Sequence, residues 1–214
     1  MKQNVEKIFN ALFEDYPALS VCKNDVKKVY EILENTYKKG GKILACGNGG
    51  SAADCEHIVG ELMKGFKLPR TLGNGDVAPF SAYDCGEEIA CGLQKGLPAI
   101  SLVSHTGLMT AFLNDCSPDL VFAQQTYGYM NECDTLVALS TSGNSKNVVN
   151  AVITAKAKKG NAIAITGESG GRLTSLCDAV IKLPSTDTAK IQEYTLPVYH
   201  ALCAMLEEEF FGDC

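Results

Sequence analysis

The chain has 214 residues, of which 46% are hydrophobic, enough for one globular domain with a sizeable core. Its formal net charge is -6 and no stripe of basic residues is visible, which argues against nucleic acid as a ligand. The N-terminus has no apolar signal core and no apolar run of about eighteen residues occurs, so we expect a cytoplasmic protein without a membrane anchor.

The chain begins with helical periodicity and then alternates apolar strands with helices. Helices are predicted at 3–14, 23–38, 52–65, from Ser117-Pro118 onward, from 147 onward, and at 187–211 with Pro197 inside. Strands are predicted at 42–46, 99–103, 135–139, 162–165 and 179–183. This alternation indicates an α/β fold with a parallel sheet covered by helices on both faces. Right-handed crossovers then place every strand-to-helix loop at one sheet edge, where ligands of such folds bind.

Residues 67–97 break this pattern. The segment is rich in Gly and Pro and shows no clear periodicity over about thirty residues, which is long for a connection. It is predicted to be either a lid or an ordered excursion. The domain prediction is therefore one domain over 1–214, with a helical pair at 1–39 and an irregular insertion at 67–97.

The chain contains ten cysteines and no Cys-x-x-Cys pair. Without a secretion signal, these are expected to be reduced thiols rather than a disulfide framework. Cys46, Cys177 and Cys203 lie in apolar runs and are expected to pack as small hydrophobic residues. Cys85 and Cys91 lie in the irregular segment and could pair or bind a metal, although two thiols alone make an incomplete zinc site.

A hydroxyl-rich loop, Ser140-Thr141-Ser142-Gly143-Asn144-Ser145, joins the third strand to the next helix. The first amides of a helix have no partners inside it, and the helix dipole favours an anion there. Four hydroxyls can donate further hydrogen bonds. The loop therefore predicts a site for a phosphate ester, and the alternative is an ordinary Ser/Asn helix cap.

A second loop, Gly47-Asn48-Gly49-Gly50-Ser51, follows the first strand. Its glycines let backbone amides approach a ligand closely, although such a turn alone is a weak signal. The following helix carries His57 and Glu61 at i and i+4, so the two side chains share one face. They could bind one divalent metal or act as a base with its orienting partner. The alternative is a surface pair worth a few tenths of a kcal/mol.

The other two histidines leave more than one interpretation open. His200 lies eight residues after Gln192 in the last helix. Over eight residues a straight helix rises about 12 Å and turns about 80° beyond two full turns, so these two side chains would struggle to hold one ion. Pro197 could bend the helix, or the ligands could come from more than one chain. Otherwise His200 would be a core histidine, while His105 could cap a loop, pack there or contact substrate.

Taken together, these residues resemble the phosphoheptose isomerases of the sugar isomerase (SIS) fold, over nearly the whole chain. The match is strongest at residues 47–61, 140–145, 166–171 and 191–200. The resemblance implies a flavodoxin-like three-layer sandwich, in which a five-stranded parallel sheet is flanked by helices, with additional N-terminal helices. It also implies a homotetramer with active sites between chains, which suits the broad apolar faces of the first and last helices.

The resemblance also implies roles for individual residues. The substrate contacts would be Asn48, Gly49, Gly50 and Ser51 in the first loop, Asn114 and Asp115 midway, and Glu61 and Gln192. The phosphate would bind Ser140, Thr141, Ser142 and Ser145. The ligands of one zinc ion per subunit would be His57, Glu61, Gln192 and His200, and the acid–base pair would be Glu61 and His200.

The activity implied is an aldose–ketose isomerisation of sedoheptulose 7-phosphate to D-glycero-D-manno-heptose 7-phosphate. Segment 67–97 departs from the family pattern because it looks longer, which leaves the identity of the sugar open. One alternative is a non-catalytic SIS protein that senses sugar phosphates or binds a replication-initiation partner. Another is an isomerase for a different sugar phosphate. The complete set of implied zinc ligands favours the enzyme.

Overall fold

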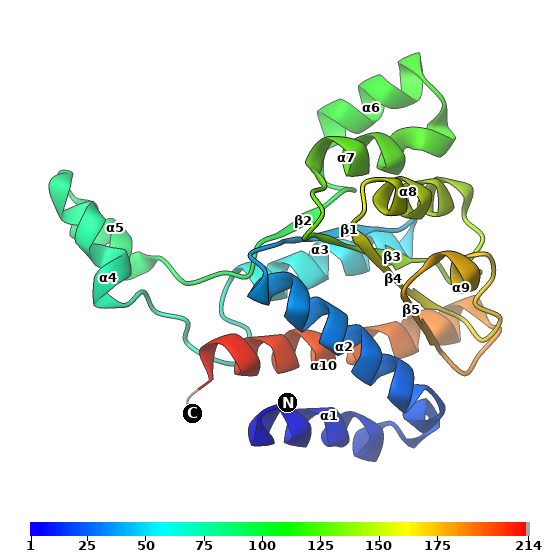
Figure 1. The fold of residues 1–214 in the computed structure, drawn as a ribbon, viewed down its shortest axis with the longest axis horizontal. Coiled ribbons are helices and arrows are strands. Elements are labelled where there is room, and N and C mark those ends of the chain that lie inside the picture. Colours follow the sequence, from blue (N-terminus) through cyan, green and yellow to red (C-terminus); the bar gives the residue numbers. More distant parts are fainter. Residues whose placement is uncertain (213–214) are drawn as a thin grey trace.

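The structure is a computed structural model that describes residues 1–212. Its centre is a five-stranded parallel sheet in the order β2-β1-β3-β4-β5 (Figure 1). The strands are β1 (Ile43–Cys46), β2 (Ala99–Ser101), β3 (Thr135–Leu139), β4 (Asn161–Thr166) and β5 (Ala179–Lys182). All five lie where the apolar runs predict strands, so the sheet prediction is confirmed.

The sheet is buried on both faces, as its continuous apolar strands require. Every residue of β1 and β3 is buried. Ile43 and Val137 contribute to the hydrophobic cluster on one face, whereas Leu44 and Leu136 contribute to the cluster on the other. Leu44 and Leu136 are also register partners on neighbouring strands, so each face carries a continuous apolar row.

Helices cover these two faces as separate layers (Figure 1). One layer holds α2 (Lys23–Lys38), α3 (Gly50–Met63) and α10 (Thr188–Phe211), and α1 (Gln3–Asp15) packs on the outside of this layer against α10. The other holds α7 (Val121–Tyr129) and α8 (Lys146–Ala157). The predicted three-layer sandwich is therefore confirmed, with α2 in one outer layer and α1 packed on the outside of that layer.

Shorter elements complete the chain. They are η1 (Pro17–Cys22), α6 (Thr106–Asp115), η3 (Pro118–Leu120) and α9 (Leu173–Leu176). Pro118 opens η3 and the chain continues directly into α7, so the predicted helix start at Ser117-Pro118 is confirmed. Helix α6 was not predicted, and it has no buried residue that would have given an apolar stripe.

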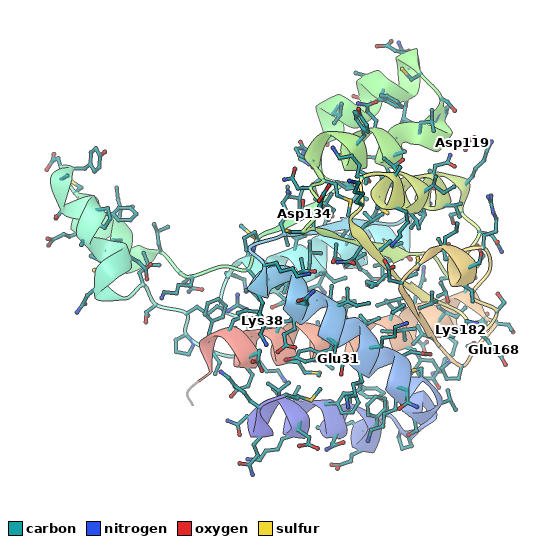
Figure 2. All side chains as sticks on the ribbon, viewed as in Figure 1. Glu31, Lys38, Asp119, Asp134, Glu168 and Lys182 are labelled. Atoms are coloured by element: carbon teal, nitrogen blue, oxygen red, sulfur yellow. The ribbon has the colours of Figure 1, made fainter. Side chains whose placement is uncertain are left out.

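Residues 71–95, named here the arm, project from the body (Figures 1 and 2). The arm contains α4 (Asn74–Val77), η2 (Ala78–Ala82) and α5 (Gly86–Gly92), whose substantial contacts are with one another. Its two ends pair as an antiparallel bridge between Thr71 and Gln94. The prediction of an irregular segment is corrected here, because short helices make up most of the arm, and of the two alternatives the ordered excursion fits this form.

Each cysteine in the part of the chain that the structure describes is a free thiol. Cys85 and Cys91 are exposed on the arm and unpaired, whereas Cys46 and Cys203 are buried as expected. Cys214 lies outside the described residues. Among residues 1–212, no helix combines the length and the apolar character that a membrane crossing needs.

Candidate active site

A cleft of about 250 Å³ opens at the carboxyl edge of the sheet, where the loops after β1 and β3 meet the start of α10. It is lined by Asn48, Gly49, Gly50, Ser51, Leu139, Ser140, Thr141, Ser145, Thr188 and Gln192. The two loops predicted to bind the substrate are therefore brought together. Hydroxyl, amide and backbone groups surround the cleft, and none of its lining residues is charged.

The serine loop is held in a shape that suits an anion. The hydroxyl oxygens of Ser140 and Ser145 lie 3.0 Å apart at the N-terminus of α8. Gly143 has a φ of +64° and packs directly on the backbone at Gly170, where a Cβ would collide. Ser142 is exposed, and its Oγ accepts a hydrogen bond from the amide of Asn144 at 3.2 Å. The Ser142 hydroxyl thus supports a turn within the loop, while Ser140, Thr141 and Ser145 line the cleft.

The glycine loop approaches α10 closely. A Cβ at position 50 would lie 2.6 Å from Nε2 of Gln192, so a larger residue here would displace the Gln192 side chain. Gly49 has a φ of +58°, a left-handed conformation that glycine adopts without strain. The amides of Asn48 and Asn147 bond to each other at 2.9 Å, which ties the loop to the start of α8.

A second cluster forms where α3 and α10 lie side by side. Nε2 of His57 lies 3.1 Å from Oε1 of Glu61 and 3.4 Å from Nε2 of His200. The other carboxylate oxygen, Oε2 of Glu61, is buried and has no hydrogen-bond partner among the described residues. Burial and the neighbouring His57 lower the pKa of His200 below its ordinary value. Two imidazole rings and one carboxylate therefore converge here, and one carboxylate oxygen is left without a partner among the described residues.

These three side chains fit a zinc ion by their chemistry. Two imidazole nitrogens and a carboxylate are a common zinc donor set, and the orphaned Oε2 of Glu61 lacks a positive partner. As they stand, the side chains touch one another, and among residues 1–212 no group of three or more His, Cys, Asp or Glu residues is found arranged to hold an ion. An ion would thus require small rotations of these side chains.

The other predicted site residues lie apart from this cluster. Gln192 lies in the cleft beside Gly50, two turns of helix before His200. Asn114 and Asp115 lie exposed at the end of α6, where Nδ2 of Asn114 donates to Asp115 at 2.8 Å. His105 packs against Tyr129, with ring centroids 5.5 Å apart. Within one chain, the structure does not bring these residues to the histidine cluster.

Sequence reasoning missed a tyrosine at this site. The hydroxyl of Tyr199 lies 2.8 Å from Nδ1 of His57, and the tyrosine is only 2% exposed. Because these residues are 142 positions apart, no local pattern predicts the contact. The only available signal was the position of Tyr199 directly before His200.

It also missed a buried ion pair behind the cluster. The guanidinium of Arg70 donates to Glu207 at 2.7 Å and to the carbonyls of Leu62 and Glu61 at 2.6 and 3.0 Å. Glu207 in turn accepts from the amides of Phe66, Lys67 and Leu68. This clamp joins the end of α3, the base of the arm and α10.

Comparisons with known proteins agree with this architecture. Models described as "SIS domain" match residues 89–206 and 18–94. The chain is 35% identical to a phosphoheptose isomerase of Burkholderia pseudomallei, over 97% of this chain and 91% of the relative. It is 36% identical to phosphoheptose isomerase 1 of Campylobacter jejuni, over 96% and 98%.

A solved structure of a phosphoheptose isomerase from Neisseria gonorrhoeae superposes with a TM-score of 0.71 at 31% identity, covering 95% of this chain and 98% of that chain. Sequence and structure therefore agree over nearly the full length. The chain belongs to the phosphoheptose isomerase family of SIS-domain proteins and is a phosphosugar isomerase.

Proposed function

We propose that this enzyme interconverts sedoheptulose 7-phosphate and D-glycero-D-manno-heptose 7-phosphate with the help of a bound zinc ion. The relatives named above are phosphoheptose isomerases, which supports the seven-carbon substrate. The observation that carries the chemistry is the buried, unpartnered oxygen of Glu61 beside two imidazoles, on a helix that begins at the cleft.

The spacing along α3 and α10 supports this assignment. Gly50 and Gln192 meet at the cleft, and His57 and His200 meet further along the same two helices. Seven residues of helix rise about 10 Å, which is comparable to the length of an extended seven-carbon sugar phosphate. A phosphate held by Ser140, Thr141, Ser142 and Ser145 would leave the carbonyl end pointing toward the histidines.

In the proposed mechanism, Glu61 takes the proton from C1 of the open-chain ketose and returns it at C2. His200 moves the proton between the carbonyl and hydroxyl oxygens, giving it to one and taking it from the other. His57, Glu61 and His200 would hold the zinc ion, which supplies polarisation of the sugar oxygens. Asn48, Gly49, Gly50 and Ser51 would hold the middle of the sugar.

Gln192, Asn114 and Asp115 are proposed to complete the site through a second chain. In one chain, Gln192 lies two helical turns from His200, and the Asn114–Asp115 pair is exposed at the tip of α6. In a homotetramer these residues could reach the site of a neighbouring subunit, with Gln192 as a zinc ligand and the other two as substrate contacts.

Substitution of Glu61 tests the proposal. Glu61→Gln keeps the shape of the side chain but removes the base, so we expect a loss of at least about 100-fold in kcat on sedoheptulose 7-phosphate. Binding of the sugar phosphate, measured by calorimetry, should change little. The matched control is Glu56→Gln on the same helix, whose exposed carboxylate accepts from Ser104 and should leave kcat unchanged. Substantial activity in Glu61→Gln would refute the assigned base.

A further inference from the structure

The hydroxyl of Tyr199 is the contact that sequence reasoning missed, and it lies on the far side of the His57 ring from Glu61. It meets Nδ1 of His57 at 2.8 Å, while Nε2 of the same ring faces Glu61 and His200. The two rings stand edge to face, with centroids 5.4 Å apart and an interplanar angle of 72°. The hydrogen bond and the edge-to-face contact from Tyr199 thus fix the orientation of the His57 ring.

The direction of this hydrogen bond follows from a third group. Asp54 lies one turn before His57 on α3, and after burial its negative charge is the next cause that raises the pKa of the Tyr199 hydroxyl. An ionised carboxylate can only accept, and a tyrosine hydroxyl has one proton to give. The Asp54 carboxylate attracts the proton of Tyr199, which leaves the phenol oxygen free to accept the Nδ1–H of His57.

We propose that Tyr199, oriented by Asp54, is a positioning residue that holds His57 in the Nδ1–H tautomer and so directs the Nε2 lone pair toward Glu61 and His200. This inference rests on the zinc centre proposed above. A histidine ligand needs an unprotonated nitrogen facing the metal, and a hydrogen bond at its other nitrogen sets which nitrogen that is.

The tautomer assignment also accounts for the uncompensated cluster. With the proton on Nδ1, Nε2 of His57 faces the Glu61 carboxylate with a lone pair and no hydrogen. Two acceptors at 3.1 Å repel each other unless a cation or proton lies between them. The Asp54–Tyr199–His57 chain would thus prepare the cluster for a cation.

Tyr199→Phe tests the inference, because it removes one hydroxyl and keeps the buried ring. We expect zinc affinity, measured by competition with a chromophoric chelator, to fall about 10- to 100-fold. The matched control is Tyr37→Phe, which removes the hydroxyl of another largely buried tyrosine. That hydroxyl lies away from the site and donates to the Pro98 carbonyl at 3.3 Å. The control should keep the zinc affinity of the unchanged protein, and both variants should keep similar melting temperatures.

The second readout needs no metal and no substrate. Nitrogen-15 NMR of the His57 ring in zinc-free protein at pH 8 should report Nδ1–H, and in Tyr199→Phe this preference should be lost. An Nε2–H ring in the unchanged protein would overturn the inference, and so would a Tyr199→Phe variant with unaltered tautomer and zinc affinity. Failure of the unchanged protein to bind zinc, with the Nδ1–H ring present, would instead reject the proposed metal centre.

Discussion

Burial controls the ionisation of single thiols in this protein. Burial raises the pKa of Cys22 to about 11 and that of Cys177 to about 12. Cys46 and Cys203 lie deeper, and burial raises the pKa of each thiol further. Cys46, Cys177 and Cys203 pack with the hydrophobic clusters, as their apolar neighbours in the sequence predict, and Cys22 packs in the same way without having been predicted.

The raised pKa values make stability fall in alkali. Above pH 9 the buried thiols of the folded state stay protonated, whereas the thiols of the unfolded chain, with a pKa near 9.0, lose their protons. The stabilisation is therefore complete below pH 9 and is lost as pH rises above it. Each such thiol should lower the free energy of unfolding by about 1.4 kcal/mol per pH unit above pH 9. Urea unfolding at pH 8, 9.5 and 10.5 measures this slope.

Two variants separate this effect from other alkaline damage. Cys46→Ala removes one fully buried thiol and should reduce the slope by one thiol's contribution, whatever it does to stability at pH 8. Cys91→Ala removes an exposed thiol on the arm and should leave the slope unchanged. Equal slopes in Cys46→Ala and the unchanged protein would contradict the argument.

Local residue patterns predicted only part of the site. The serine loop, the glycine loop and the His57–Glu61 pair are short-range features, so their spacing was visible in the sequence. Contacts such as Tyr199 with His57 join residues far apart in the chain and depend on how α10 packs against α3. The helix arithmetic for Gln192 and His200 agrees with the structure, which leaves them apart.

Helices α3 and α10 form the framework of the site, and the Arg70–Glu207 clamp fixes one end of it. Both side chains of this pair are almost fully buried, with exposures of 0% and 1%. The Arg70 guanidinium also lies 4.7 Å from the centroid of the Phe211 ring. The pair therefore orders the last turn of α3, immediately beyond Glu61.

Substitution of Arg70 should lower the stability of the fold strongly. Arg70→Met leaves Glu207 as an uncompensated buried charge, so we expect the free energy of unfolding in urea to fall by about 3 kcal/mol or more. Lys156→Met breaks a partly exposed pair with Asp178 and should cost less than about 1 kcal/mol. Losses of similar size in the two variants would show that the clamp is not a main support of the fold.

Whether an element could be predicted depended on its length and its burial. The five strands and the long helices have apolar runs or stripes, because each packs on the sheet or, in the case of α1, on α10. Helix α6 has no buried residue, and α4, η2 and α5 are too short to show a helical period. Their formation depends on local turns and tertiary contacts that leave little trace in hydrophobicity.

At the scale of the whole molecule, the body and the arm are nearly independent. Within residues 1–212, the arm is bonded to the body at its base, where the amide of Lys95 donates to the Arg70 carbonyl at 2.7 Å and the amide of Gly65 donates to the Gln94 side chain at 2.7 Å. Tyr83 and Ile89 on the arm are 75% and 54% exposed. The folded body therefore gains little from the arm.

Excision of the arm tests this independence. Thr71 and Gln94 are already bridge partners, so a short Gly-containing turn can replace residues 72–93 without moving the base. We expect calorimetry to give a melting temperature within a few degrees of that of the full chain, since shortening a loop changes its closure entropy only slightly.

Sedimentation equilibrium of the full chain should give the mass of four chains if the proposed tetramer forms. If the excised variant melts at a lower temperature but keeps the same number of chains per assembly, the arm supports the fold of its own chain. If the variant assembles with fewer chains, the arm makes contacts between chains.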